Sequence, residues 1–148
     1  MLNRLQDVFA SFQKHNVRYV VIGGIAAILH GVPRATFDLD ILIEATPDNA
    51  QNLLDALTEA RLGTATLTSV QEILDNEITI FQDRLRIDVQ TSTPGLAFST
   101  AWKDRQEMTY YNQHFYVASK PDLIASKLAA GRPVDLDDVK ALRLDEED

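Results

Sequence analysis

The sequence contains no cysteine. This absence excludes disulfide bonds, thiolate zinc sites and cysteine nucleophiles, and it fits the reducing cytoplasm in which we expect the protein to reside. Long apolar runs are also absent, since no segment approaches the roughly 20 residues needed to cross a bilayer. The first residues likewise lack the apolar stretch of a signal peptide. We therefore expect no association with a membrane.

Basic residues are scarce. The chain has 14 Lys and Arg residues against 22 Asp and Glu residues, a formal net charge of −8. A protein that coats DNA or RNA needs a basic stripe to replace the counterions of the phosphate backbone, so we expect no bulk DNA binding. A short RNA end can still be held by a few basic contacts. Part of the acidic excess lies in the run 145–148, where we expect a solvated tail.

The 148 residues are expected to form a single domain. Strand-like and helix-like segments are interspersed, with no internal repeat and no linker-like stretch. The pattern predicts an α/β (α+β) fold with a mixed β-sheet flanked by helices. We expect its core at about 1–118, a pair of C-terminal helices at about 119–144 and the acidic tail at 145–148.

Hydrophobic periodicity and capping residues predict the individual elements. Thr46 and Pro47 suit the N-cap and the first position of a helix. Helices are expected at about 2–12, 25–30, 48–60, 70–74, 119–130 and 134–144, strands at about 18–22, 38–43, 77–81 and 85–90, and a turn leading into a strand at 110–117.

The most informative segment is a predicted strand that ends at Gly23-Gly24 and is followed by Asp38-Leu39-Asp40 on the next strand. Residues i and i+2 of a strand face the same side, so Asp38 and Asp40 project together while Leu39 points into the core. Two neighbouring carboxylates repel each other, and a divalent cation removes the repulsion. Oxygen ligands of this kind suit Mg²⁺ or Mn²⁺.

A third carboxylate and the glycine pair complete the pattern. Asp88 stands between the apolar Ile87 and Val89, so burial of these two neighbours would turn Asp88 toward the other acids. Three carboxylates on neighbouring strands are typical of two-metal phosphoryl transfer. At Gly23-Gly24 the absence of side chains lets backbone N–H groups approach phosphate oxygens closely.

This arrangement resembles a known signature. Ile22-Gly23-Gly24, followed after thirteen residues by Asp38-Leu39-Asp40-Ile41, resembles the glycine and paired-aspartate motif of the polymerase-β nucleotidyltransferase superfamily. Asp88 resembles the third catalytic aspartate of that superfamily. Together with residues 34–40 and 122–139, the chain is similar to small bacterial and archaeal nucleotidyltransferase-like proteins, which include toxin components of abortive-infection toxin–antitoxin systems.

The resemblance implies a nucleotidyltransferase fold and the transfer of a nucleoside monophosphate from an NTP, such as ATP, to a hydroxyl. The acceptor could be protein, RNA or a small molecule, and a toxin role would bring an antitoxin partner. Asp38, Asp40 and Asp88 would be catalytic and would bind the metal, with Asp88 also the candidate base. Lys127 and Arg34 would join Gly23-Gly24 in binding the nucleotide phosphates.

Other interpretations stay open at this point. The fold could bind nucleotide without chemistry, as a regulatory partner protein, or its acids could be incidental to a structural domain. Lys127 could be an ordinary solvated helix lysine. The acids at positions 135, 137 and 138 suit a helix start whatever the function. Trp102 and Tyr110-Tyr111 could stack on a base, although packing is the commoner use of such aromatics.

Overall fold

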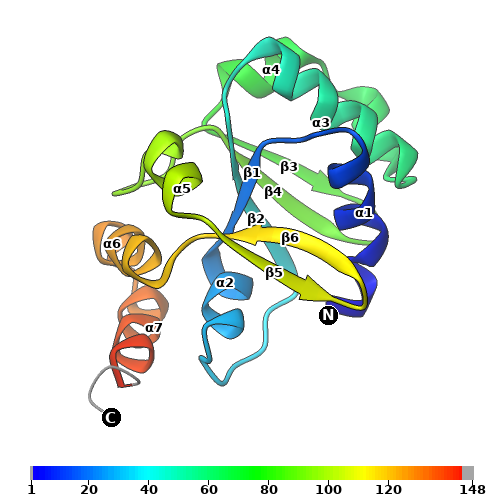
Figure 1. Cartoon of the computed structure of the whole chain (residues 1–148). Coiled ribbons are helices and arrows are strands. Elements are labelled where there is room, and N and C mark those ends of the chain that lie inside the picture. The colour runs from blue at the N-terminus through cyan, green and yellow to red at the C-terminus, as the bar shows by residue number, and fades with distance from the viewer. Residues whose placement is uncertain (1, 145–148) are drawn as a thin grey trace.

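A computed structural model describes residues 2–144, and the expected acidic tail at 145–148 lies outside these described residues. Within them, a six-stranded mixed sheet has the order β3-β4-β2-β1-β6-β5 (Figure 1). Pairs β1–β6 and β2–β4 are parallel, and the other neighbours are antiparallel. The strands are β1 Tyr19–Ile22, β2 Asp38–Ile43, β3 Ile78–Gln82, β4 Arg86–Gln90, β5 Gln106–Tyr110 and β6 Gln113–Val117.

Helices cover the sheet. In Figure 1, α1 and α3 lie on one side of the strands, while α6 and α7 form a pair on the other side. This arrangement confirms the predicted mixed α/β fold with a C-terminal helical pair. None of the helices within residues 2–144 is long and apolar enough to cross a membrane. The helices are α1 Gln6–Lys14, α2 Gly23–Leu29, α3 Pro47–Glu59, α4 Val70–Asp75, α5 Phe98–Asp104, α6 Lys120–Ala130 and α7 Pro133–Leu144, with short 3-10 turns at Leu2–Arg4 and Gly63–Leu67.

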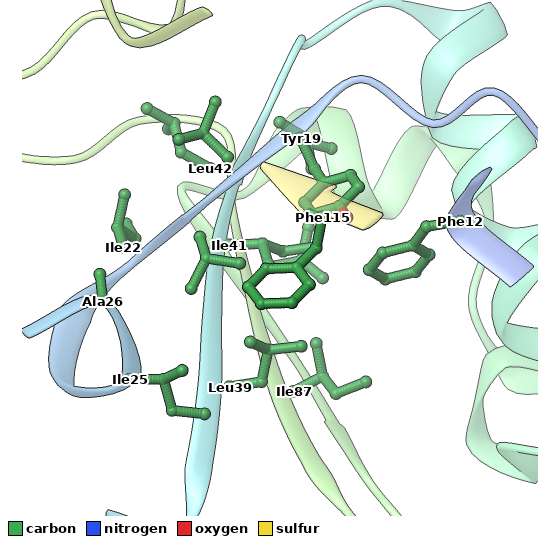
Figure 2. Close-up of a cluster of buried hydrophobic side chains, with 14 of the residues drawn as sticks. Phe12, Tyr19, Ile22, Ile25, Ala26, Leu39, Ile41, Leu42, Ile87 and Phe115 are labelled. Carbon is green, nitrogen blue, oxygen red and sulfur yellow. The ribbon is translucent and has the colours of Figure 1, made fainter. Parts of the chain in front are cut away.

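The main core lies on the face of the sheet opposite the aspartates. Leu39, Ile41 and Ile87 are fully buried and alternate along β2 and β4 with the half-buried acidic positions. Figure 2 shows them beside Phe12 and Phe115, which come from α1 and β6. Burying each such side chain contributes about 1.5–3 kcal/mol, and this fixes which face of β2 and β4 points away from the core.

The N-caps of α3 and α6 are the residues that the sequence predicts. Thr46 accepts a hydrogen bond from the backbone N–H of Asn49, and Pro47 occupies the first turn of α3, as predicted. Ser119 caps α6 in the same way through the N–H of Asp122. These side chains satisfy N–H groups that have no partner inside the helix.

Two elements were not anticipated. Helix α5 buries only Ala101 among its residues, and β5 is an edge strand with no fully buried position. Their apolar patterns are short, with three positions in α5 and two in β5, and a pattern of this length does not identify an element. Tyr110 therefore ends β5 instead of beginning a turn, and the turn itself is made by Tyr111 and Asn112, which both have positive φ. Helix α2 also begins earlier than expected, at Gly23.

Candidate active site

A cleft of about 550 Å³ opens on the polar face of the sheet, between the start of α2 and the α6–α7 pair. It receives side chains from β2, β4, the segment before β2, and both C-terminal helices. Every site residue predicted from the sequence lines this cleft: Gly23, Gly24, Arg34, Asp38, Asp40, Asp88 and Lys127.

Strand register brings the three aspartates to one face. In the parallel pair β2–β4, Asp40 lies opposite Asp88, and Asp38 lies opposite Arg86. Ile87 and Val89 are buried, as the prediction for Asp88 required. The expected geometry is therefore present, with Asp40 and Asp88 as direct neighbours across the two strands.

The environment of Asp40 disfavours its charged form. The pKa of Asp40 is raised to about 7, mainly by burial and next by the negative charges of Asp88 and Asp38, against the weaker opposing effect of Lys127 and Arg132. A carboxyl group of this kind gains from a nearby cation. Cation binding would therefore relieve an electrostatic cost at Asp40.

Arg86 is a cleft residue that the sequence prediction missed. Its Nε donates to Asp88 Oδ1 at 2.9 Å and its Nη2 donates to Asp88 Oδ2 at 3.2 Å. The same Nε lies 3.7 Å from Asp38 Oδ2. These contacts, led by the hydrogen bond that Arg86 donates to Asp88, raise the pKa of Arg86. The i, i+2 spacing of Arg86 and Asp88 on one strand was the signal available in the sequence.

Close packing leaves little room for a β carbon at Gly23 and Gly24. Gly23 has φ of +70°, and a β carbon there would collide with the Asp40 carboxylate, whose Cγ would lie at 2.9 Å. A β carbon on Gly24 would lie 2.9 Å from Arg34 Nη2 and 3.1 Å from Thr36 Oγ1. The start of α2 is therefore in direct contact with an acid on one side and a guanidinium on the other.

Asp138 joins Arg34 and Lys127. Arg34 forms a two-pronged ion pair with it, Nε to Oδ1 and Nη2 to Oδ2, both at 2.8 Å. Lys127 Nζ donates to Asp138 Oδ2 at 2.8 Å. Lys127 is 4% exposed and Asp138 is 1% exposed, so the interpretation of Lys127 as a solvated helix lysine is wrong. Its ammonium group is buried against a carboxylate at the edge of the cleft.

A second pair extends this network. Arg132 binds Asp135 through Nε at 2.8 Å and Nη2 at 3.2 Å, and Lys127 Nζ lies 3.7 Å from Asp135 Oδ1. Burial would raise the pKa of Asp135, but the hydrogen bond and charge of Arg132 outweigh it and lower the pKa. The pKa of Asp138 is likewise lowered by Arg34 and Lys127 against the effect of burial. Both acids are therefore ionised.

The helix-start explanation for the acids near position 135 was incomplete. Asp135 and Asp138 are spaced i, i+3, which places both on the buried side of α7. Their two carboxylates face three cations, Arg34, Lys127 and Arg132. This wall of the cleft therefore has a surplus of one positive charge, opposite the carboxylates of β2 and β4.

The donor set of the aspartates fits a hard divalent cation, since it consists of carboxylate oxygens. As they stand, however, no three His, Cys, Asp or Glu side chains within residues 2–144 are grouped closely enough to hold an ion. In this arrangement Arg86 pairs with both oxygens of Asp88. The aspartates fit Mg²⁺ or Mn²⁺ on the condition that Arg86 releases Asp88.

The aromatic candidates pack away from the cleft. Trp102 stacks on Phe98 with ring centroids 5.7 Å apart, and the Arg105 guanidinium lies 3.8 Å from the centroid of the Trp102 ring. Trp102 also meets the Tyr116 ring edge to face at 5.3 Å, and these ring contacts support the packing explanation. The cavity of about 360 Å³ that it lines is separate from the cleft. Tyr110 and Tyr111 contact each other edge to face at the β5–β6 turn. His30 is within hydrogen-bond distance, 2.8 Å, of the Ala118 carbonyl, a structural contact.

A protein-family model covers almost the whole chain. Residues 2–147 match the model of the family DUF6036, described as "Nucleotidyltransferase of unknown function". The match spans the sheet, the cleft and the C-terminal helical pair alike. No match was found among curated proteins.

Proposed function

The chain belongs to this family of nucleotidyltransferases, and from that premise we propose that it is a metal-dependent enzyme of the polymerase-β type. It would transfer a nucleoside monophosphate from an NTP, such as ATP, to a hydroxyl on protein, RNA or a small molecule. The observation that carries the proposal is the presence of Asp38, Asp40 and Asp88 on one sheet face, opposite a wall with surplus positive charge, in a single cleft.

The reaction assigns a role to each side of the cleft. The acceptor hydroxyl oxygen forms a bond to the α-phosphorus, and the bond from that phosphorus to the oxygen bridging the β-phosphate breaks. Pyrophosphate leaves with the electron pair, and the hydroxyl proton passes to the Asp88 carboxylate. Mg²⁺ or Mn²⁺, held by the three aspartates, would neutralise the triphosphate and lower the pKa of the acceptor hydroxyl.

The opposite wall would hold the phosphates. Arg34 and Lys127 are fixed in place by Asp138, so they would provide preorganised positive charge with little loss of side-chain freedom. Gly23 and Gly24 allow backbone N–H groups to approach the same region. Arg132 lies at the rim with 72% of its side chain exposed, which leaves it accessible to a ligand.

The test is transfer of label from each α-labelled NTP, with Mg²⁺ or Mn²⁺, to a panel of proteins, RNAs and small hydroxyl compounds. We expect transfer by the wild type and none by Asp40→Asn, while Asp55→Asn, an exposed carboxylate on α3, keeps full activity. Transfer by Asp40→Asn at the wild-type rate would contradict the proposal.

One observation favours a second candidate, a protein that binds nucleotide without chemistry. Arg86 occupies both oxygens of Asp88, the proposed base, and such a pairing suits a regulatory partner protein. Titration calorimetry distinguishes the two functions. Binding of NTP with Mg²⁺, together with no turnover across the acceptor panel, would establish the binding function.

We extend the proposal to a toxin role with an antitoxin partner, on the strength of the resemblance to abortive-infection toxin components. Induced expression in a bacterial host tests it directly. Growth arrest by the wild type but not by Asp40→Asn supports a toxin whose effect depends on the site. Normal growth with full-length protein accumulating in the cells argues against a toxin.

A further inference from the structure

Arg86 lies on the same face of β4 as the proposed base. It stands directly opposite Asp38 in the β2–β4 register and two residues before Asp88. Three carboxylates and this one guanidinium therefore share the polar face of two adjacent strands. No role follows for Arg86 from the nucleotidyltransferase chemistry described above.

We propose that Arg86 is an internal counter-ion that competes with the divalent cation for Asp88, and so sets the affinity of the cleft for metal. This inference rests on the proposed metal-dependent function. In the protein, Arg86 and the cation would be alternatives at the Asp88 oxygens, and metal binding would displace the guanidinium.

The geometry supports competition over simple coexistence. The guanidinium uses both carboxylate oxygens of Asp88, Oδ1 at 2.9 Å and Oδ2 at 3.2 Å. Arg86 therefore occupies the side of the carboxylate from which a cation could bind both oxygens at once, and a cation bound elsewhere on Asp88 would lie close to the positive guanidinium. The side chain of Asp88 is only 14% exposed, which restricts the approach of a cation to the carboxylate from other directions.

Exposure also shows which partner can move. The side chain of Arg86 is 38% exposed, and Arg86 itself lines the cleft. A long, partly solvated arginine can leave its partner at modest cost, because water replaces the hydrogen bonds that an exposed guanidinium gives up. Asp88 is held between the buried Ile87 and Val89, so the arginine is the mobile member of the pair.

The experiment is a Mn²⁺ titration of the whole chain without nucleotide, with free Mn²⁺ followed by electron paramagnetic resonance. Arg86→Gln should bind Mn²⁺ about tenfold more tightly than the wild type, and Arg86→Lys, which keeps the charge without the two-pronged contact, should fall between them. Arg132→Gln is the matched control. It removes one positive charge from the same cleft, but that charge is paired with Asp135, so we expect a change of no more than about twofold.

The outcomes separate this inference from the proposed function. Equal affinity of wild type and Arg86→Gln, or an equal gain in Arg132→Gln, overturns the counter-ion role while leaving the metal site intact. Absence of Mn²⁺ binding in every variant overturns the metal site and the counter-ion role together. Mn²⁺ binding by Arg86→Gln alone supports the inference most strongly. Circular dichroism confirms folding of each variant, and Arg86→Lys provides the comparison if Arg86→Gln does not fold.

Discussion

At the scale of single residues, the backbone of Gly23 lies directly against the Asp40 side chain. The positive φ of Gly23 and the absence of a β carbon both serve to place backbone against the Asp40 carboxylate. A substitution here would therefore disturb a proposed metal ligand as well as the local backbone.

Gly23→Ala should lower the free energy of unfolding by more than the cost of a left-handed alanine, which is about 1–2 kcal/mol. Gly131→Ala is the matched control, because Gly131 has almost the same φ, +68°, but a β carbon there would meet nothing closer than 3.7 Å. Urea unfolding of both variants measures the difference. Equal losses in the two variants would show that contact with Asp40 is unimportant.

Asp40 should make stability depend on pH. Its pKa is about 7 in the folded chain against an ordinary value of 3.8, so between these values the folded chain binds the extra proton. The resulting stabilisation amounts to up to about 4 kcal/mol. It is fully present below pH 3.8 and is lost as the pH rises through about 7. Asp40→Asn, which does not titrate, should match the wild type at pH 4 and exceed it in stability at pH 8.

Urea unfolding from pH 4 to 8.5 in the presence of a chelator checks this prediction. Asp55→Asn should follow the wild-type curve throughout, because its carboxylate is exposed. A wild-type curve that rises with pH would contradict the shifted pKa of Asp40.

The candidate site could be predicted from sequence where it depends on local spacing. Asp38 and Asp40 share a face because a strand repeats every two residues, and Asp88 follows from its buried neighbours. The pairing of Arg34 with Asp138 joins positions 104 apart in sequence, and no periodicity encodes such a contact. Arg86 was missed for a different reason, because it was treated as one polar residue in a strand and not as the partner of Asp88.

At the scale of elements, the junction of α6, α7 and the segment before β2 depends on Asp138. This carboxylate accepts from both Arg34 and Lys127 and is almost fully buried. Removing one partner of a buried ion pair leaves an uncompensated charge, which costs more than the pair contributes.

Asp138→Asn should therefore lower the free energy of unfolding by about 3–5 kcal/mol. Its neighbour Asp137 is exposed, so Asp137→Asn should change stability by less than about 0.5 kcal/mol. Adding Lys127→Met to Asp138→Asn should restore part of the loss, because the buried unpaired ammonium is removed. Urea unfolding of the four proteins forms the comparison, and equal stability of the two single variants would contradict the buried junction.

Helices and strands were predicted correctly from the sequence where one face of the element is buried and the other is exposed. Strand β2 was placed at its observed bounds, and the caps of α3 and α6 marked their starts. Prediction failed at α5 and β5, which bury few side chains and are stabilised by contacts with the rest of the fold. The order of the strands was also beyond sequence reasoning, since it depends on packing between distant segments.

For the whole molecule, the excess of acidic groups should make stability respond to divalent cations. Mn²⁺ at 100 times its dissociation constant should add about 2.7 kcal/mol, which corresponds to a rise in Tm of roughly 5–10 °C for a domain of this size. Calorimetry at matched ionic strength, with NaCl as reference, measures the shift. Asp40→Asn should lose most of it, and an undiminished shift in that variant would assign the effect to general screening of the net charge of −8.

The contribution of α7 to the cleft has a consequence for how the protein is made. A nascent chain presents all three aspartates once Asp88 has been added, but Arg34 and Lys127 meet Asp138 only after fifty further residues. At about 5–20 residues per second, the ribosome needs roughly 3–10 s to cover that interval. During this time the three aspartates have been synthesised but the partner of Arg34 and Lys127 has not, so the cleft gains both of its walls only late in synthesis.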